Sequence, residues 1–128
     1  NFLVRDQLVD KGQYEVLLDA PELDLPTGEK FVPDIVARDA AGEILFIEVE
    51  RSTSKDEGYR TQKWRNFYAA THGRIYIYCD KRPFMNRLMG EVNDALRDYR
   101  FSSWFSNLDE VRDGVRGTDG SIWLYKRE

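Results

Sequence analysis

Three carboxylates in the first half of the chain have the spacing of a divalent-metal site. Glu48 and Glu50 are two residues apart at the end of an apolar run, so in a β-strand both side chains point to the same face. Asp34 lies on the preceding strand, across a hairpin centred near residues 40–41, and this register predicts that it sits beside Glu48. Like charges this close repel each other and cost stability unless a cation or a basic side chain offsets them. Hard oxygen ligands in this arrangement suit Mg²⁺ or Mn²⁺.

The elements that must position these carboxylates follow from local sequence patterns. Helices are predicted over residues 1–10, 55–71 and 84–98, and strands over residues 14–18, 31–37, 44–50, 74–79 and 121–125. Residues 20–30, with two prolines and a glycine, are predicted to form a loop. The order α-β-β-β-α-β-α, followed by a short β-rich tail, predicts an α/β fold with a mixed central sheet flanked by helices. The helix over residues 55–71 is expected to cross one face of this sheet.

The composition suits one globular domain. The chain has 128 residues, of which 41% are hydrophobic and 33% charged. We expect residues 1–128 to form a single domain, with a core over about residues 1–98 and a β-rich C-terminal extension over 99–128. No apolar run approaches the roughly 20 residues that span a bilayer, so no membrane association is expected.

The single cysteine and the first residue bear on setting and partners. Cys79 excludes an internal disulfide and a Cys-based zinc cluster, and its apolar surroundings predict a buried side chain. A reducing, cytoplasmic location is expected. The sequence begins at Asn1 rather than Met, which suggests a processed chain or a fragment of a longer protein. A homodimer and an additional N-terminal domain both stay open.

The net charge of −4 disfavours a nucleic-acid partner, but the distribution of charge along the chain matters more. Residues 1–50 carry four basic and twelve acidic side chains, whereas residues 51–74 carry six basic and two acidic ones. An acidic site beside a basic rim is what a metal-dependent phosphodiesterase needs, although a solvated helix face has the same charge pattern. The candidate phosphate contacts are Arg51, Lys55, Arg60 and Arg65. For Arg51, an ion pair with a carboxylate is the open alternative.

Pro33-Asp34, followed by Glu48-Val49-Glu50 on the paired strand, resembles the PD-(D/E)XK signature of restriction-endonuclease-like nucleases. The predicted element order over about residues 1–80 is similar to the αβββαβ core of that superfamily. More narrowly, Pro33-Asp34-Ile35 and the stretch over residues 46–53 resemble bacterial replication-relaxation-type proteins. Ser52 departs from those proteins, which usually carry glycine at that point.

The resemblance implies a metal-dependent nuclease. Asp34 and Glu48, aided by the carbonyl of Val49, would hold Mg²⁺ or Mn²⁺, which would polarise the scissile phosphate and lower the pKa of the attacking water. The sequence departs from the signature at Glu50, where the superfamily usually has a lysine that orients or activates the water. A carboxylate there can serve as general base or as a second-metal ligand. Lys63 borders the predicted buried stripe of the helix over residues 55–71, so it either replaces the missing lysine or is an ordinary flanking residue.

Three functions therefore stay open. The first is a metal-dependent deoxyribonuclease, favoured by the acidic triad. The second is a catalytically degenerate DNA-binding module in plasmid or mobile-element replication, favoured by the absence of the signature lysine. The third is a protein-interaction domain, for which a patch of Trp104, Phe105 and Trp123 is a candidate surface if these side chains are not part of the core.

Overall fold

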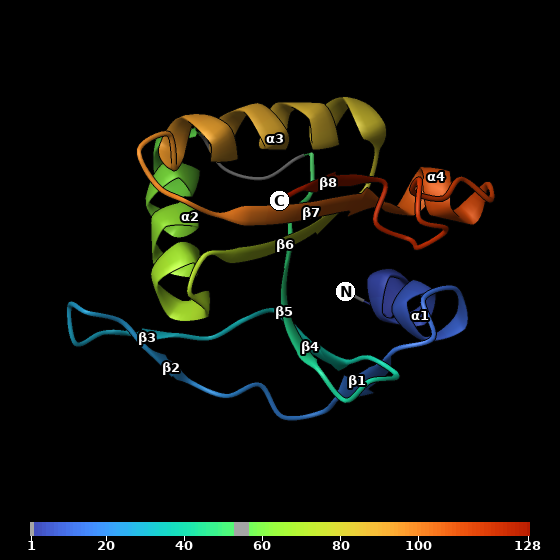
Figure 1. Ribbon diagram of the computed structural model, residues 1–128, viewed down its shortest axis with the longest axis horizontal. Helices are drawn as coiled ribbons and strands as arrows, with labels where there is room; N and C mark the ends of the chain where they lie inside the picture. The colour runs from blue at the N-terminus through green and yellow to red at the C-terminus, as the bar shows by residue number, and fades with distance from the viewer. Residues whose placement is uncertain (1, 53–56) are drawn as a thin grey trace.

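The computed structural model describes residues 2–52 and 57–128, with the side chains of 57–59 left out (Figure 1). Its elements, in chain order, are α1 (Phe2–Asp10), β1 (Glu15–Leu17), β2 (Leu23–Asp24), β3 (Lys30–Phe31), β4 (Ile35–Arg38), β5 (Ile44–Val49), α2 (Glu57–Thr71), β6 (Arg74–Cys79), α3 (Arg82–Ala95), β7 (Ser102–Asn107), α4 (Leu108–Arg112) and β8 (Tyr125–Arg127). The expected alternation of helices and strands is confirmed up to α3.

A six-stranded mixed sheet forms the centre of the molecule, with the strand order β1-β4-β5-β6-β7-β8. The pairs β1–β4 and β4–β5 are antiparallel, the pairs β5–β6 and β6–β7 are parallel, and β8 returns antiparallel to β7. The parallel steps need crossover connections, which α2 and α3 provide. The prediction of an α/β fold with a mixed sheet flanked by helices is therefore confirmed.

Helices cover both faces of the sheet, so the alternation of side chains along each strand produces two cores. Ile75 and Ile77 of β6 pack with residues of α2 and α3. Tyr76 and Tyr78 point the other way and pack with residues of α1 and α4. Among the helices of residues 2–52 and 57–128, none has the length and apolar character to cross a membrane.

Three sequence predictions need correction. The strand expected over residues 31–37 is interrupted, because Pro33 separates β3 from β4. The loop expected over residues 20–30 contains β2, which pairs with β3 in a small second sheet. The expected extension over residues 99–128 adds both β7 and β8 to the main sheet, and β8 begins where the strand predicted over 121–125 was to end.

The aromatic residues of the C-terminal segment belong to the core. Trp104 and Phe105 lie on β7, and both are buried, as is Trp123. Trp104 stacks on Tyr76 with ring centroids 4.2 Å apart. The alternative of an exposed aromatic patch for a partner protein is therefore wrong for these three side chains.

Candidate acidic centre at the end of β5

The hairpin of β4 and β5 decides which side chains meet at the acidic centre. Its turn is closed by Asp39, whose carboxylate accepts hydrogen bonds from two backbone N–H groups of the turn, both at 2.9 Å. The register that results pairs Ile35 with Ile47. One step further along, Asp34 lies opposite Glu48, as the hairpin spacing predicted.

Two hydrogen bonds hold Asp34 and Glu48 against each other. The backbone N–H of Asp34 donates to Oε2 of Glu48 at 2.8 Å, and the backbone N–H of Val49 donates to Oδ2 of Asp34 at 2.9 Å. Each carboxylate is therefore oriented by the backbone of the opposite strand. The second oxygen of each group, Oδ1 of Asp34 and Oε1 of Glu48, takes no part in these two bonds.

Lys63 reaches this pair of strands from α2. Its Nζ lies 3.6 Å from Oε1 of Glu48 and 3.6 Å from Oε1 of Glu50. The Lys63 side chain is only 19% exposed, so its aliphatic stem is covered while its amine faces the two glutamates. The position expected from the helical wheel is confirmed, and the catalytic role of Lys63 stays a prediction.

Burial raises the pKa of both glutamates. Glu48 is 2% exposed, and the loss of solvent raises its pKa from 4.5 to about 8, with Lys63 opposing the shift and Asp34 adding to it. Burial also raises the pKa of Glu50, where Lys63 and then Arg60 oppose it. Shifts of this kind, in a group beside other charged side chains, are characteristic of functional sites.

We expect the free energy of unfolding to fall as the pH rises from about 5 to about 8. The pKa of Glu48 in the folded chain lies above its ordinary value of 4.5, so the folded state binds a proton in this window that the unfolded state has released. Raising the pH removes that proton and costs stability, by at most about 1.4 kcal/mol per pH unit for one group. Urea denaturation at several pH values in this range measures the slope.

Glu48→Gln is the matched variant for this prediction, because glutamine keeps the size and the acceptor oxygen but does not titrate. We expect Glu48→Gln to show a flatter pH dependence and to be at least as stable as the wild type near pH 8. If the slope were the same in both proteins, a group other than Glu48 would be responsible for it.

The oxygen atoms of the acidic centre are fewer than a metal site built entirely from protein side chains would need. In residues 2–52 and 57–128, no group of three or more His, Cys, Asp or Glu side chains is arranged to hold a metal ion. Mg²⁺ is commonly held by one or two carboxylates, with water and substrate phosphates completing its shell. Asp34 and Glu48, with the carbonyl of Val49, supply oxygen donors of this kind on paired strands, and metal binding by them stays a prediction.

The structure describes three of the four basic residues expected to contact phosphate, and for one of them, Arg60, the prediction is wrong. Arg60 is buried, and its guanidinium donates to both carboxylate oxygens of Glu91 at 2.7 and 2.8 Å. It joins α2 to α3 and does not face a nucleic-acid surface. Arg65 is exposed, with its Nε donating to the carbonyl of Ala95 at 3.1 Å. Lys55 lies outside the described residues.

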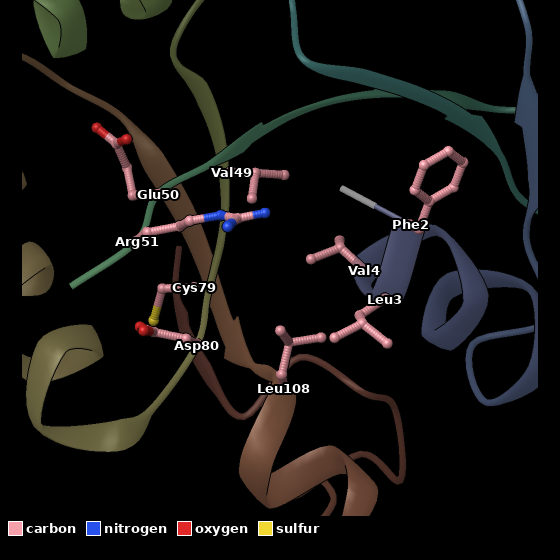
Figure 2. A pocket seen from close by; sticks show the side chains of 9 residues that line it. All are labelled: Phe2, Leu3, Val4, Val49, Glu50, Arg51, Cys79, Asp80 and Leu108. Atoms are coloured by element: carbon pink, nitrogen blue, oxygen red, sulfur yellow. The ribbon is translucent and has the colours of Figure 1, made fainter. Parts of the chain in front are cut away.

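Arg51 is the third described residue, and it lies at a pocket of about 410 Å³ near the end of β5 (Figure 2). We call this cavity the Arg51 pocket; its apolar lining consists of Phe2, Leu3, Val4, Val49 and Leu108. Figure 2 shows the Arg51 guanidinium directed into the cavity and the Glu50 carboxylate directed away from it. Arg51 has no ion pair or hydrogen bond with any residue in the described part of the chain. The ion pair with a carboxylate, which the sequence left open as the alternative to a phosphate contact, is therefore not seen there.

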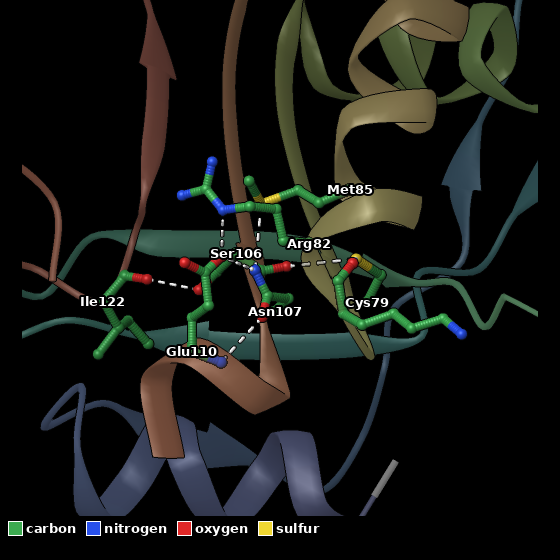
Figure 3. Close-up of polar contacts among 8 residues, drawn as sticks. Cys79, Arg82, Met85, Ser106, Asn107, Glu110 and Ile122 are labelled. Carbon is green, nitrogen blue, oxygen red and sulfur yellow. Dashed lines mark hydrogen bonds and ion pairs between the residues drawn. The ribbon is translucent and has the colours of Figure 1, made fainter. Parts of the chain in front are cut away.

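A second polar network, at the ends of β6 and β7, holds α4 against the sheet (Figure 3). Asn107 caps α4 by accepting a hydrogen bond from the backbone N–H of Glu110 at 2.9 Å, and it donates to Oε1 of Glu110 at 2.9 Å. Arg82 donates to the same oxygen at 2.8 Å, which lowers the pKa of Glu110. Burial raises the pKa of nearby Cys79 to about 12, which keeps its thiol protonated near neutral pH. We assign this network a structural role.

A scan against protein-family models and searches of curated proteins and solved structures found no match to this chain. The fold and the site define an α/β protein with a six-stranded mixed sheet and an acidic centre where β5 ends. The function must therefore be argued from this geometry and from the sequence pattern.

Proposed function

We propose that this chain is a metal-dependent nuclease-like domain that hydrolyses phosphodiester bonds of DNA at the acidic centre. The observation that carries the proposal is the position of Lys63, whose amine lies 3.6 Å from both Glu48 and Glu50. The PD-(D/E)XK signature would supply a cation from position 50, whereas in this chain α2 supplies one beside Glu48 and Glu50.

The connectivity of the elements also supports this proposal. Along the chain, α1, β1, β4, β5, α2 and β6 follow in the order αβββαβ once the small β2–β3 sheet is set aside. The first three of these strands are antiparallel, and β6 joins β5 in parallel. That is the order expected of a restriction-endonuclease-like core.

The proposed roles follow from the geometry of the side chains. Asp34, Glu48 and the Val49 carbonyl would hold Mg²⁺ or Mn²⁺, and the bound cation would stabilise charge on the phosphate and lower the pKa of a coordinated water. Glu50 acts as general base toward the attacking water, and its raised pKa brings it closer to neutral pH, where such a base is most effective. Lys63 holds Glu50 in place and stabilises negative charge that develops on the phosphate.

A catalytically degenerate DNA-binding module, of the kind used in plasmid or mobile-element replication, is the second candidate. It is favoured by the absence, among the described residues, of three acidic side chains around one point. Glu48 is buried, with a pKa of about 8, so it can stay protonated near neutral pH without a bound cation. In that case Arg51 and Arg65 would contact DNA, and Lys63 would serve only to balance the buried glutamates.

Metal binding tests the proposal first. We expect Mn²⁺ to bind saturably to the wild-type chain in isothermal titration calorimetry, and Asp34→Ala to weaken this binding by about tenfold or more, because even second-shell changes cost that much at metal sites. Asp24→Ala is the matched control, since its carboxylate is 81% exposed and lies outside the centre. We expect it to bind Mn²⁺ as the wild type does.

Cleavage of plasmid DNA in the presence of Mg²⁺ then separates the two candidates. Nicking or linearisation by the wild type, absent in Asp34→Ala, would support the nuclease. DNA binding with no cleavage, and with no Mn²⁺ binding at millimolar concentration even when DNA is present, would contradict the nuclease and support the degenerate module.

A further inference from the structure

The Arg51 pocket combines an apolar lining with a single cation directed into it. Val4, Val49 and Leu108 supply aliphatic walls, and Phe2 offers a ring that is 85% exposed. Glu50 and Asp80 also border the pocket, but Figure 2 shows both carboxylates directed away from the cavity. A ligand that fits this pocket therefore has a flat or apolar body and a negative group at one end.

The guanidinium of Arg51 is available to such a negative group. It is exposed and has no acidic partner in the part of the chain that the structure describes. Arginine presents several donors in a planar fork that matches phosphate oxygens. Across the pocket, Phe2 of α1 has an exposed aromatic ring, and such rings are the usual platforms for nucleobases.

The pocket is also contiguous with the acidic centre. Val49, Glu50 and Arg51 are consecutive, and neighbouring Cα atoms are about 3.8 Å apart. Glu50 faces Lys63 on one side of β5, while Val49 and Arg51 face the pocket on the other. A DNA strand that presents one phosphate to the centre can therefore present its next nucleotide to the pocket.

We infer that the Arg51 pocket holds one unpaired nucleotide of the strand whose phosphate lies at the acidic centre. The substrate class is accordingly DNA with a single-stranded segment or end. This inference rests on the proposed function. A volume of about 410 Å³ lies in the roughly 300–1,000 Å³ range of pockets that enclose small molecules, whereas a duplex cannot enter it. A paired base would first have to leave its stack, and an unpaired base loses least in doing so.

Titration of the full chain with thymidine 5′-monophosphate, followed by methyl NMR, tests the pocket directly. We expect saturable shifts at the methyl groups of Leu3, Val4, Val49 and Leu108. Thymidine and inorganic phosphate, each added alone, should bind at least about fivefold more weakly, because each lacks one half of the recognised group. Arg51→Gln should weaken binding of the nucleotide about tenfold, since a charged hydrogen bond to phosphate is lost. Arg97→Gln, at an arginine that follows α3 with a 74% exposed side chain and does not line the pocket, is the matched control and should leave it unchanged.

Two results would overturn this inference. One is an absence of methyl shifts at the pocket with the nucleotide at millimolar concentration. The other is binding that Arg51→Gln and Arg97→Gln change equally, which would indicate a diffuse charge effect.

Fluorescence anisotropy with a labelled single strand and its fully paired duplex distinguishes failure of the inference from failure of the proposed function. We expect the single strand to bind at least about fivefold more tightly, and Arg51→Gln to remove that preference. Equal binding of both DNAs, together with metal-dependent cleavage of both, would overturn the inference and leave the nuclease standing. A preference for the single strand that depends on Arg51, without cleavage, would refute hydrolysis and uphold the nucleotide pocket.

Discussion

Replacement of Arg60 by methionine is expected to lower the free energy of unfolding by about 3–5 kcal/mol, the usual cost of stranding one partner of a buried ion pair. The Arg60 side chain is 2% exposed and that of Glu91 is 9% exposed, with donor–acceptor distances of 2.7 and 2.8 Å. Arg60→Met leaves the Glu91 carboxylate in the α2–α3 interface without the guanidinium. Urea denaturation monitored by circular dichroism measures the loss.

Two further variants make this result interpretable. The double variant Arg60→Met with Glu91→Leu should recover most of the loss, because apolar pairs of similar volume often match a buried ion pair in stability. Arg82→Met breaks a more exposed pair, with Arg82 at 53% exposure and Glu110 at 22%, and should cost about 1 kcal/mol or less. A loss in Arg60→Met no larger than that in Arg82→Met would show that the buried pair contributes little in solution.

The acidic centre was predictable because it depends on local rules. The turn around Asp39 fixes the hairpin, the hairpin fixes the register, and the register places Asp34 opposite Glu48. The two-residue spacing of Glu48 and Glu50 then determines their common face, where Lys63 contacts both. Each step follows from residues close in sequence or from the period of one helix.

The role of Arg60 could not be predicted from the sequence. It lies four residues before Trp64 and seven before Phe67, so helical periodicity places it on the buried stripe of α2. The sequence therefore indicates a buried position for Arg60, but it does not show which carboxylate would pair with the guanidinium. Without that partner, the arginine is interpreted as a phosphate contact. Glu91 lies 31 residues further along the chain, on a different helix, and only tertiary packing brings the two together.

The strand β7 was missed because it lacks the usual alternation. It is covered on both faces, so the adjacent residues Trp104 and Phe105 are both buried in opposite cores. Its other positions include Ser103, Ser106 and Asn107, which are buried polar residues. Ser106 is satisfied by donating to the carbonyl of Ile122 at 2.5 Å, a contact that no local pattern predicts.

The Arg51 pocket could not be found from sequence for a related reason. Its walls come from α1, from the ends of β5 and β6, and from the first residue of α4. The apolar residues Phe2 and Leu3 suggested only a helix, since their high exposure, 85% and 67%, is a property of the folded chain. Alternation did predict that Arg51 points away from Glu50, and Figure 2 shows this arrangement.

If the chain hydrolyses DNA, we expect Lys63→Met to lower the single-turnover cleavage rate by about 10²–10³, the range typical of removing one group that stabilises charge in the transition state. The amine lies 3.6 Å from both glutamates, so its loss removes the only cation that contacts both among the described residues. Mn²⁺ binding should be retained or strengthened, because one positive charge near the metal ligands has been removed. Calorimetry and a quenched cleavage assay on the same preparation measure the two effects.

The combination of slow cleavage and intact metal binding distinguishes a catalytic Lys63 from a structural one. A merely structural lysine would lower Mn²⁺ affinity and stability together, because the glutamates would lose their orientation. Lys30→Met is the matched control, since Lys30 pairs with the exposed Asp24 in the small β2–β3 sheet, and it should cleave at the wild-type rate. If Lys63→Met cleaved DNA at the wild-type rate, Lys63 of α2 would not replace the missing signature lysine. Glu50 would then activate the water without a lysine.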